Sequence, residues 1–192
     1  MIAIIKYSAG NIRSVQNAVN RLGYDCIITD SVSDILAADK VIIPGVGEAG
    51  SAMRYLKEKK LDKAIISFTR PVLGICLGLQ LLCRSSEEGN TRCIGIYDTD
   101  VKRLPPGNKV PHTGWDNFTR IEGDLFRGIL AEEDMYYVHS YYSGLCRYTT
   151  AVCEYILPFS AAMQKENFYA VQFHPEKSKD AGDKILKNFL EL

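Results

Sequence analysis

The stretch PVLGICLGLQ, residues 71–80, holds a cysteine between two glycines directly after an apolar run. The run predicts a buried strand over 71–75, and the residues after Cys76 predict a helix over about 77–85. A sharp turn from strand to helix leaves no room for neighbouring side chains, and Gly74 and Gly78 remove them. The pattern therefore predicts a nucleophile elbow that presents the Cys76 thiol at a helix start, where the helix dipole favours a thiolate.

Strands and helices alternate around this stretch through the first half of the chain. Strands are predicted over 2–6, 25–29 and 41–43, with helices over 12–22 and 50–66. This alternation is typical of a mostly parallel central sheet with flanking helices. The second half has strand-like runs at 94–96, 135–138, 151–155 and 169–173, then an amphipathic helix around 185–190. We therefore expect one α/β domain over residues 1–192, with antiparallel additions at one edge of its sheet.

The composition argues against several classes of protein. The 192 residues are 46% hydrophobic, and 23 basic side chains balance 23 acidic ones. This balance gives no reason to expect nucleic acid or a membrane as a partner, and no apolar run approaches the roughly 20 residues of a membrane span. The six cysteines lack metal-site spacing, and no export signal precedes the first strand. We expect a cytoplasmic protein with reduced thiols, no metal and no cofactor.

Residues near the C-terminus supply the groups that a cysteine nucleophile needs. His174 follows an apolar strand, and Glu176 points the same way two residues later on extended backbone. His174 is therefore predicted to be the base, with one ring nitrogen toward Cys76 and the other oriented by Glu176. A capping histidine beside a solvated glutamate is the ordinary alternative.

A glycine-rich turn, Pro44-Gly45-Val46-Gly47, follows the predicted strand at 41–43. Glycines let backbone N–H groups turn toward a ligand. The N–H groups of Val46, Gly47 and Leu77 are predicted to hold the negative oxygen of a tetrahedral intermediate. Taken alone, the turn is equally consistent with an ordinary strand-to-helix connection.

Together and in this order, the three segments resemble the class I, triad-type glutamine amidotransferases. The joint match spans most of the chain and is far more specific than any one motif. It implies a flavodoxin-like α/β fold and hydrolysis of the glutamine side-chain amide through a γ-glutamyl thioester on Cys76. The segments at 7–11, 44–47, 109–115, 137–142 and 172–178 are similar to the glutaminase subunits of imidazole glycerol phosphate synthase.

That resemblance implies further functional residues and a partner. Contacts with bound glutamine are implied for Gly45, Gln80, Glu88, Ser140 and Tyr141. A partner interface is implied around Asn11, Trp115, Tyr136 and Lys177. The implied partner is a (β/α)8-barrel cyclase subunit, which forms a heterodimer with the glutaminase and uses its ammonia to make imidazole glycerol phosphate and AICAR in histidine biosynthesis. His112 and His139 are interpreted as structural or interface residues rather than bases.

Two alternatives remain open at this level. One is the glutaminase subunit of an anthranilate or aminodeoxychorismate synthase, although Val46 and Leu79 stand where those subunits typically carry proline and histidine. The other is a non-catalytic, glutamine-binding regulatory homologue, which would have no need of the complete set of three predicted catalytic residues. Ser8, Ala49 and Asp116 depart from residues common among the synthase glutaminases, and Ala49 bears on the packing of the glycine-rich turn.

Overall fold

The chain was analysed as a computed structural model that describes residues 1–7 and 10–192, so Ser8 lies outside the described residues. Its central sheet has eight strands in the order β2-β1-β3-β4-β14-β13-β12-β9. Five of them run parallel: β2 (Cys26–Thr29), β1 (Ile2–Ile5), β3 (Lys40–Ile43), β4 (Val72–Ile75) and β14 (Phe168–Val171). The others are antiparallel additions at one edge: β13 (Leu157–Lys165), β12 (Thr149–Tyr155) and β9 (Arg120–Ile121). The predicted fold class is confirmed.

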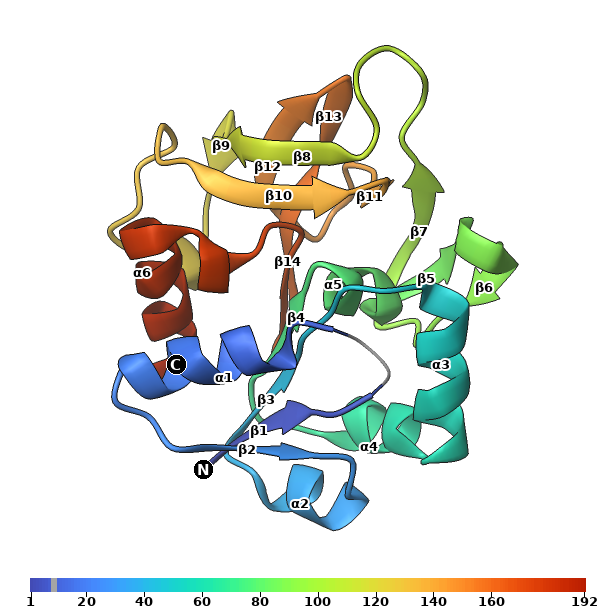
Figure 1. Cartoon of the computed structure of the whole chain (residues 1–192), viewed down its shortest axis with the longest axis vertical. Helices are drawn as coiled ribbons and strands as arrows, with labels where there is room; N and C mark the ends of the chain where they lie inside the picture. The colour runs from blue at the N-terminus through green and yellow to red at the C-terminus, as the bar shows by residue number, and fades with distance from the viewer. Residues whose placement is uncertain (8–9) are drawn as a thin grey trace.

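Helices cover both faces of the parallel part (Figure 1). They are α1 (Ile12–Arg21), α2 (Val32–Ala37), α3 (Ala49–Glu58), α4 (Leu61–Ser67), α5 (Leu77–Leu82) and α6 (Lys179–Leu190). In β1, Ile2 and Ile4 enter the core beneath α1 and α6, whereas Ala3 and Ile5 enter the core beneath α2 to α5. Because successive strand residues face opposite sides, a strand buried on both faces must be apolar throughout.

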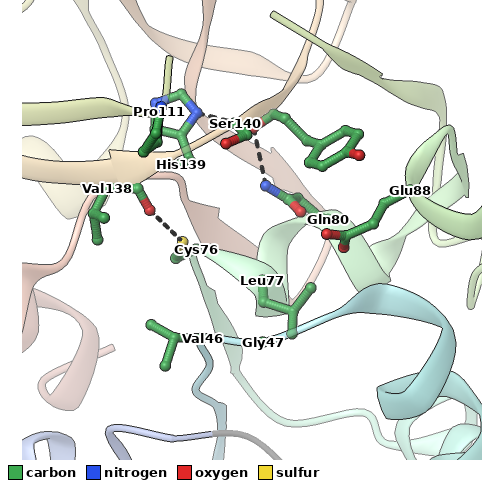
Figure 2. Close-up of a pocket in the computed structure, with 11 residues that line it drawn as sticks. Val46, Gly47, Cys76, Leu77, Gln80, Glu88, Pro111, Val138, His139 and Ser140 are labelled. Carbon is green, nitrogen blue, oxygen red and sulfur yellow. Dashed lines mark hydrogen bonds between the residues drawn. The ribbon is translucent and has the colours of Figure 1, made fainter. Parts of the chain in front are cut away.

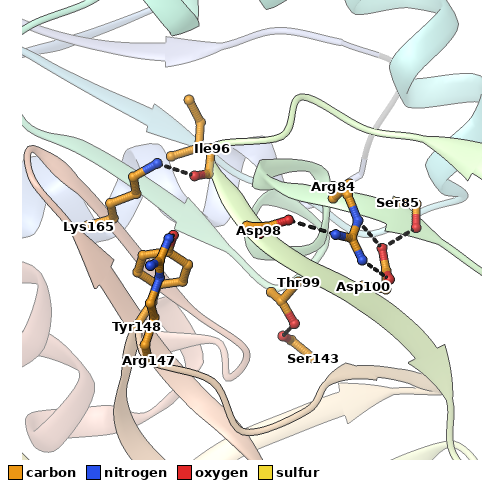
Figure 3. Close-up of polar contacts among 10 residues, drawn as sticks. All are labelled: Arg84, Ser85, Ile96, Asp98, Thr99, Asp100, Ser143, Arg147, Tyr148 and Lys165. Carbon is orange, nitrogen blue, oxygen red and sulfur yellow. Dashed lines mark hydrogen bonds and ion pairs between the residues drawn. The ribbon is translucent and has the colours of Figure 1, made fainter.

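Two smaller sheets flank the central one. β8 (His112–Asp116) pairs antiparallel with β10 (Met135–His139), and Figure 1 shows the pair lying across β12 and β13. The other sheet has the order β11-β7-β5-β6, built from β11 (Tyr141–Ser143), β7 (Tyr97–Arg103), β5 (Cys83–Ser86) and β6 (Thr91–Arg92). Arg84 of β5 bridges Asp98 and Asp100 of β7, and Lys165 of β13 donates to the Ile96 carbonyl just before β7 (Figure 3). The Arg84 ion pairs join β7 to the strand that follows α5, and the Lys165 contact joins the start of β7 to the central sheet.

The short 3-10 helices η1 (Glu88–Asn90), η2 (Asp124–Phe126) and η3 (Pro175–Lys177) complete the elements. Within residues 1–7 and 10–192, no helix combines the length and the hydropathy that crossing a membrane requires.

Three local predictions were wrong. The helix predicted over 50–66 is two helices, because the charged run at 57–60 cannot continue a buried face and Lys60 adopts a left-handed φ of 59°. The helix predicted over 77–85 ends at Leu82, because Cys83 begins β5 and pairs with Tyr97. The strand predicted at 94–96 is a connection that leads into β7.

Candidate active site

Cys76 occupies the turn between β4 and α5 in a strained backbone conformation, with φ 52° and ψ −103°. A side chain at either flanking glycine would collide with backbone. A Cβ on Gly74 would lie 2.8 Å from the carbonyl carbon of Gly78, and a Cβ on Gly78 would lie 2.0 Å from the Ile43 carbonyl oxygen. The two glycines therefore permit the close packing of α5 on β3 and β4 that fixes the position of Cys76.

His174 and Glu176 come together at the end of β14. The Glu176 carboxylate accepts from His174 Nδ1 at 2.8 Å, and both side chains are fully buried. His174 Nε2, the second ring nitrogen, is buried and has no hydrogen-bond partner among the described residues. Asn11, implied by the resemblance to lie at a partner interface, donates its side-chain amide to the same carboxylate oxygen.

The environment of His174 favours its charged form. Burial lowers the pKa of His174, but the negative charges of Cys76 and Glu176 and the hydrogen bond to Glu176 outweigh burial and raise the pKa to about 10. An opposite charge close to an imidazole favours the protonated ring. The ring is therefore suited to donate a proton to a leaving group beside Cys76.

A cavity of about 250 Å³ lies in front of Cys76, a size suited to a small ligand (Figure 2). Most of the residues predicted to touch an oxyanion or substrate line it: Val46, Gly47, Leu77, Gln80, Glu88, Ser140 and Tyr141. Gly45 does not line the cavity. A Cβ there would lie 2.2 Å from the Tyr7 hydroxyl oxygen, so this glycine makes room for Tyr7, which donates to the Pro44 carbonyl.

The Leu77 N–H, predicted to bind an oxyanion, is occupied in this structure. It donates to the Gly45 carbonyl oxygen at 3.3 Å. Gly47, which lines the cavity, has a φ of 143° that side-chain-bearing residues rarely adopt. The glycine-rich turn is thus packed against the elbow, and one of its carbonyls occupies the N–H that was predicted to bind an oxyanion.

Two glutamine side chains, Gln80 and Gln172, connect the Tyr141 carbonyl to the Cys76 sulfur. Gln80 Nε2 donates to the Tyr141 carbonyl at 3.0 Å and to Gln172 Oε1 at 3.3 Å. Gln172 Nε2 in turn lies 3.5 Å from the Cys76 sulfur. The sequence reasoning gave Gln172 no role, although a polar residue directly after the apolar strand 168–171 was a usable signal.

Glu88 joins the cavity to the start of α3. Its carboxylate accepts from the Ala49 N–H at 2.8 Å, and Glu48 caps the same helix through the N–H groups of Gly50 and Ser51. Burial raises the pKa of Glu88, and the nearby charge of Glu48 adds to the effect. A half-buried carboxylate facing a cavity suits a cationic group such as an α-ammonium. Ala49 is fully buried, so the departure at this position is a packing residue.

Three of the four predicted interface residues form one exposed cluster. The rings of Trp115 and Tyr136 lie 5.7 Å apart, and Trp115 is 46% exposed. The Lys177 ammonium lies 5.7 Å from the Tyr136 ring centre, and that of Lys179 lies 5.0 Å from the Trp115 ring centre. Aromatic side chains such as Trp115 and Tyr136 are enriched at protein interfaces, and the two ammonium groups lie within the distance of favourable cation–π contacts.

Comparisons with known proteins agree with this geometry. Residues 3–192 match the family model described as glutamine amidotransferase class-I. An imidazole glycerol phosphate synthase subunit HisH from Bacteroides fragilis (strain YCH46) is 56% identical over 194 residues, which cover 100% of this chain and 99% of that protein. The HisH subunit of Bacteroides thetaiotaomicron is 52% identical with the same coverage, and that of Shewanella loihica is 44% identical over 98% of this chain and 89% of its own.

Solved structures show the same fold at low sequence identity. A crystal structure of a glutamine amidotransferase superposes with a TM-score of 0.77 at 18% identity, covering 100% of this chain and 98% of that one. The structure of PurLQS from Thermotoga maritima gives 0.72 at 16% identity over 99% and 97%. The chain therefore belongs to the class-I glutamine amidotransferases and, among them, to the HisH subunits of imidazole glycerol phosphate synthase.

Proposed function

We propose that the chain hydrolyses glutamine to glutamate and ammonia by nucleophilic catalysis at Cys76 and passes the ammonia to a cyclase subunit. One observation carries this proposal: the strained Cys76 faces a small cavity, and a buried His174 held by Glu176 has its second ring nitrogen free. This is the arrangement of nucleophile, base and orienting carboxylate that acyl transfer needs.

The reaction proceeds in two displacements. The Cys76 thiolate attacks the amide carbon of glutamine, and the tetrahedral intermediate collapses as His174 gives a proton to the departing ammonia. The γ-glutamyl thioester then remains on the sulfur. His174 takes a proton from a water molecule, whose oxygen attacks the thioester carbon, and glutamate leaves as the thiolate reforms. Glu176 orients the ring and balances its charge in both steps.

Stabilising the negative oxygen requires a rearrangement at the glycine-rich turn. Because the Leu77 N–H donates to the Gly45 carbonyl, it cannot bind an oxyanion until that hydrogen bond breaks. Losing one oxyanion donor typically slows an acyl transfer ~10²–10³-fold. We therefore expect weak glutaminase activity as long as this donor is occupied, and higher activity once the hydrogen bond to Gly45 breaks.

Binding of glutamine is assigned to the walls of the cavity. Glu88 pairs with the α-ammonium, and backbone groups of Ser140 and Tyr141 contribute further contacts. The Gln80 amide nitrogen is taken by Tyr141 and Gln172, so Gln80 offers its carbonyl oxygen to the substrate.

The partner is a (β/α)8-barrel cyclase that forms a heterodimer with this chain in the cytoplasm. Ammonia is mostly protonated in neutral water, so direct transfer to the barrel preserves it as a nucleophile. The cluster of Trp115, Tyr136 and Lys177 is assigned to the interface because Trp115 and Lys177 are exposed and the Tyr136 carbonyl accepts from the His174 N–H at 2.8 Å. The whole chain acts as one glutaminase domain.

Glutamine hydrolysis, measured with and without the cyclase and its substrate, tests the proposal. We expect strong activation by the loaded cyclase and a covalent adduct when Cys76 meets an electrophilic glutamine analogue. Cys76→Ala should abolish both, whereas Cys93→Ala, a matched change at another buried cysteine, should retain both. Hydrolysis that survives Cys76→Ala, or a chain that does not associate with the cyclase, would refute the corresponding part.

A further inference from the structure

A series of polar contacts runs from the surface to Gln80 and Tyr141, the part of the cavity lining that we call the substrate wall. His112 and His139, the two histidines outside the proposed catalytic set, lie in the middle of this series. His139 Nδ1 lies 2.9 Å from the Tyr141 carbonyl oxygen, and His139 Nε2 lies 3.2 Å from His112 Nδ1. His112 Nε2 lies 3.5 Å from the Asp116 carboxylate, whose side chain is 29% exposed. At the inner end, the Tyr141 carbonyl also accepts from Gln80.

The surroundings hold both rings in place. His112 and His139 are opposite one another in the register of β8 and β10. The His112 ring is stacked between Tyr137 and Tyr155, with centroid distances of 4.9 and 3.8 Å. The two imidazoles are 3% and 5% exposed. Neither ring has space to turn away, so each nitrogen keeps its present neighbour.

The number of ring protons decides how many of these contacts can be hydrogen bonds. Three contacts connect two terminal acceptors, the Tyr141 carbonyl and the Asp116 carboxylate, through two imidazoles. Each neutral imidazole carries one N–H. Two neutral rings therefore leave one contact with an acceptor at both ends. The contact without a proton falls at the Asp116 end, because that distance is the longest of the three and the carboxylate reaches water.

With a third proton, every contact in the series has a donor. Burial lowers the pKa of His139 to about 3, so that ring stays neutral and donates from Nδ1 to Tyr141. Burial also lowers the pKa of His112, but the charge of Asp116 opposes the effect, so the proton enters at His112 Nε2. The other titratable groups that face this pair are Tyr137, Cys153, Tyr155 and His174. The pKa values of Tyr137 and Cys153 are raised by burial, so both stay neutral.

We propose that Asp116, His112 and His139 form a proton-dependent relay that positions the Tyr141 carbonyl and, through it, the Gln80 amide at the substrate wall. The three are positioning residues, since none touches the reacting atoms. This inference rests on the proposed glutaminase function, because Gln80 is assigned there to glutamine. The relay completes its contacts when His112 is protonated and loosens at the Asp116 end when His112 is neutral.

Nuclear magnetic resonance of the imidazole nitrogens tests the relay without any reference to activity. The chain has three histidines, so a ¹⁵N-histidine-labelled sample gives three ring systems, assigned by single substitutions. We expect His139 to stay neutral with its proton on Nδ1 down to about pH 5, and His112 to gain a proton at Nε2 as the pH falls. Asp116→Asn should lower the pKa of His112 by about one unit. A proton on His139 Nε2, or a His112 titration unmoved by Asp116→Asn, would overturn the proposal.

Glutamine kinetics in the complex with the loaded cyclase supply the functional arm. We expect the wild-type KM for glutamine to rise about three- to tenfold as the pH rises through the pKa of His112, which lies below 6.5, because the loss expected for one ordinary hydrogen bond is of this size. Asp116→Asn should abolish this rise and leave the pH profile of kcat unchanged, because an asparagine amide donates to neutral His112 without an added proton. Asp134→Asn, a change at an exposed carboxylate next to the residue that pairs with Asp116 in the sheet register, should behave as wild type.

The two arms separate the possible failures. Equal KM profiles for wild type and Asp116→Asn refute the relay. An active-site chemistry other than glutamine hydrolysis leaves no KM to measure and refutes the proposed function, while the nitrogen spectra still decide the proton positions.

Discussion

Gly78→Ala is the sharpest test of the elbow, because the space for its methyl group is occupied by backbone. The new Cβ would lie 2.0 Å from the Ile43 carbonyl oxygen, whereas such contacts essentially never fall below 3.0 Å. α5 and β3 must therefore separate by at least 1.0 Å, the difference between these two distances. Overpacking a buried site typically costs ~1–3 kcal/mol, and we expect the upper end here because a strand carbonyl cannot rotate aside as a side chain can.

Urea unfolding measures this cost directly. Gly78→Ala should lower the free energy of unfolding by about 3 kcal/mol. With an unchanged m-value, this loss appears as a lower urea midpoint. It should also slow labelling of Cys76 by an electrophilic glutamine analogue, since Cys76 is carried by the same turn. Gly144→Ala is the matched control: its Cβ would meet nothing within 4 Å, so we expect a change within ~0.5 kcal/mol. A Gly78→Ala protein with wild-type stability and labelling rate would refute the packing argument.

Three further changes probe the site. Glu176→Gln should lower kcat ~10²–10⁴-fold. Because the pKa of His174 is raised from 6.5 to about 10, the wild type holds the resulting stabilisation fully below pH 6.5 and loses it as pH rises through 10; stability curves of Glu176→Gln should be flatter there. The pKa of His139 is lowered from 6.5 to about 3, so the unfolded state takes up a proton before the folded state as the pH decreases. Wild-type stability should therefore decrease as the pH is lowered from 6.5 to about 3, and His139→Asn should reduce this decrease in thermal unfolding. Glu88→Gln should raise KM for glutamine about tenfold or more with a smaller effect on kcat, measured in steady-state assays with the loaded cyclase, because it removes the charge opposite the α-ammonium.

The sequence predicted the parallel core well because strands buried on both faces have a clear signature. The runs at 2–6, 41–43 and 71–75 are continuous and apolar, and each became a strand within about two residues of the predicted ends. The short elements of the second half were harder to predict. β5 follows α5 with no turn residue between them, so nothing local marks the end of the helix at Leu82. Pairing with Tyr97 decides that boundary, and such a tertiary contact leaves no local pattern in the sequence.

The arrangement of the site was predictable where a motif joined chemistry to geometry. Gly74 and Gly78 had to be glycines for steric reasons, and the structure gives the same reasons. The free second nitrogen of His174 beside Cys76 also agrees with the arrangement predicted from spacing, although the catalytic roles stay predictions. The state of the oxyanion donor was not predictable, since a hydrogen bond between Leu77 and Gly45 depends on peptide orientation rather than on residue type. Gln172 was missed because an amide has no distinctive chemistry until its neighbours are known.

The surroundings of two buried histidines give a physical reason for the prediction that His174, and not His139, is the base. His174 and His139 are both buried, and burial alone would lower the pKa of each. His174 lies near two acidic groups, Cys76 and Glu176, which outweigh burial and keep its ring protonated. His139 has no acidic neighbour of this kind, so burial lowers its pKa and its ring stays neutral. Ammonia can leave only if a ring next to the sulfur already holds a proton. His174 alone of these two meets that condition at neutral pH, and His139 is left to donate a fixed hydrogen bond to the substrate wall.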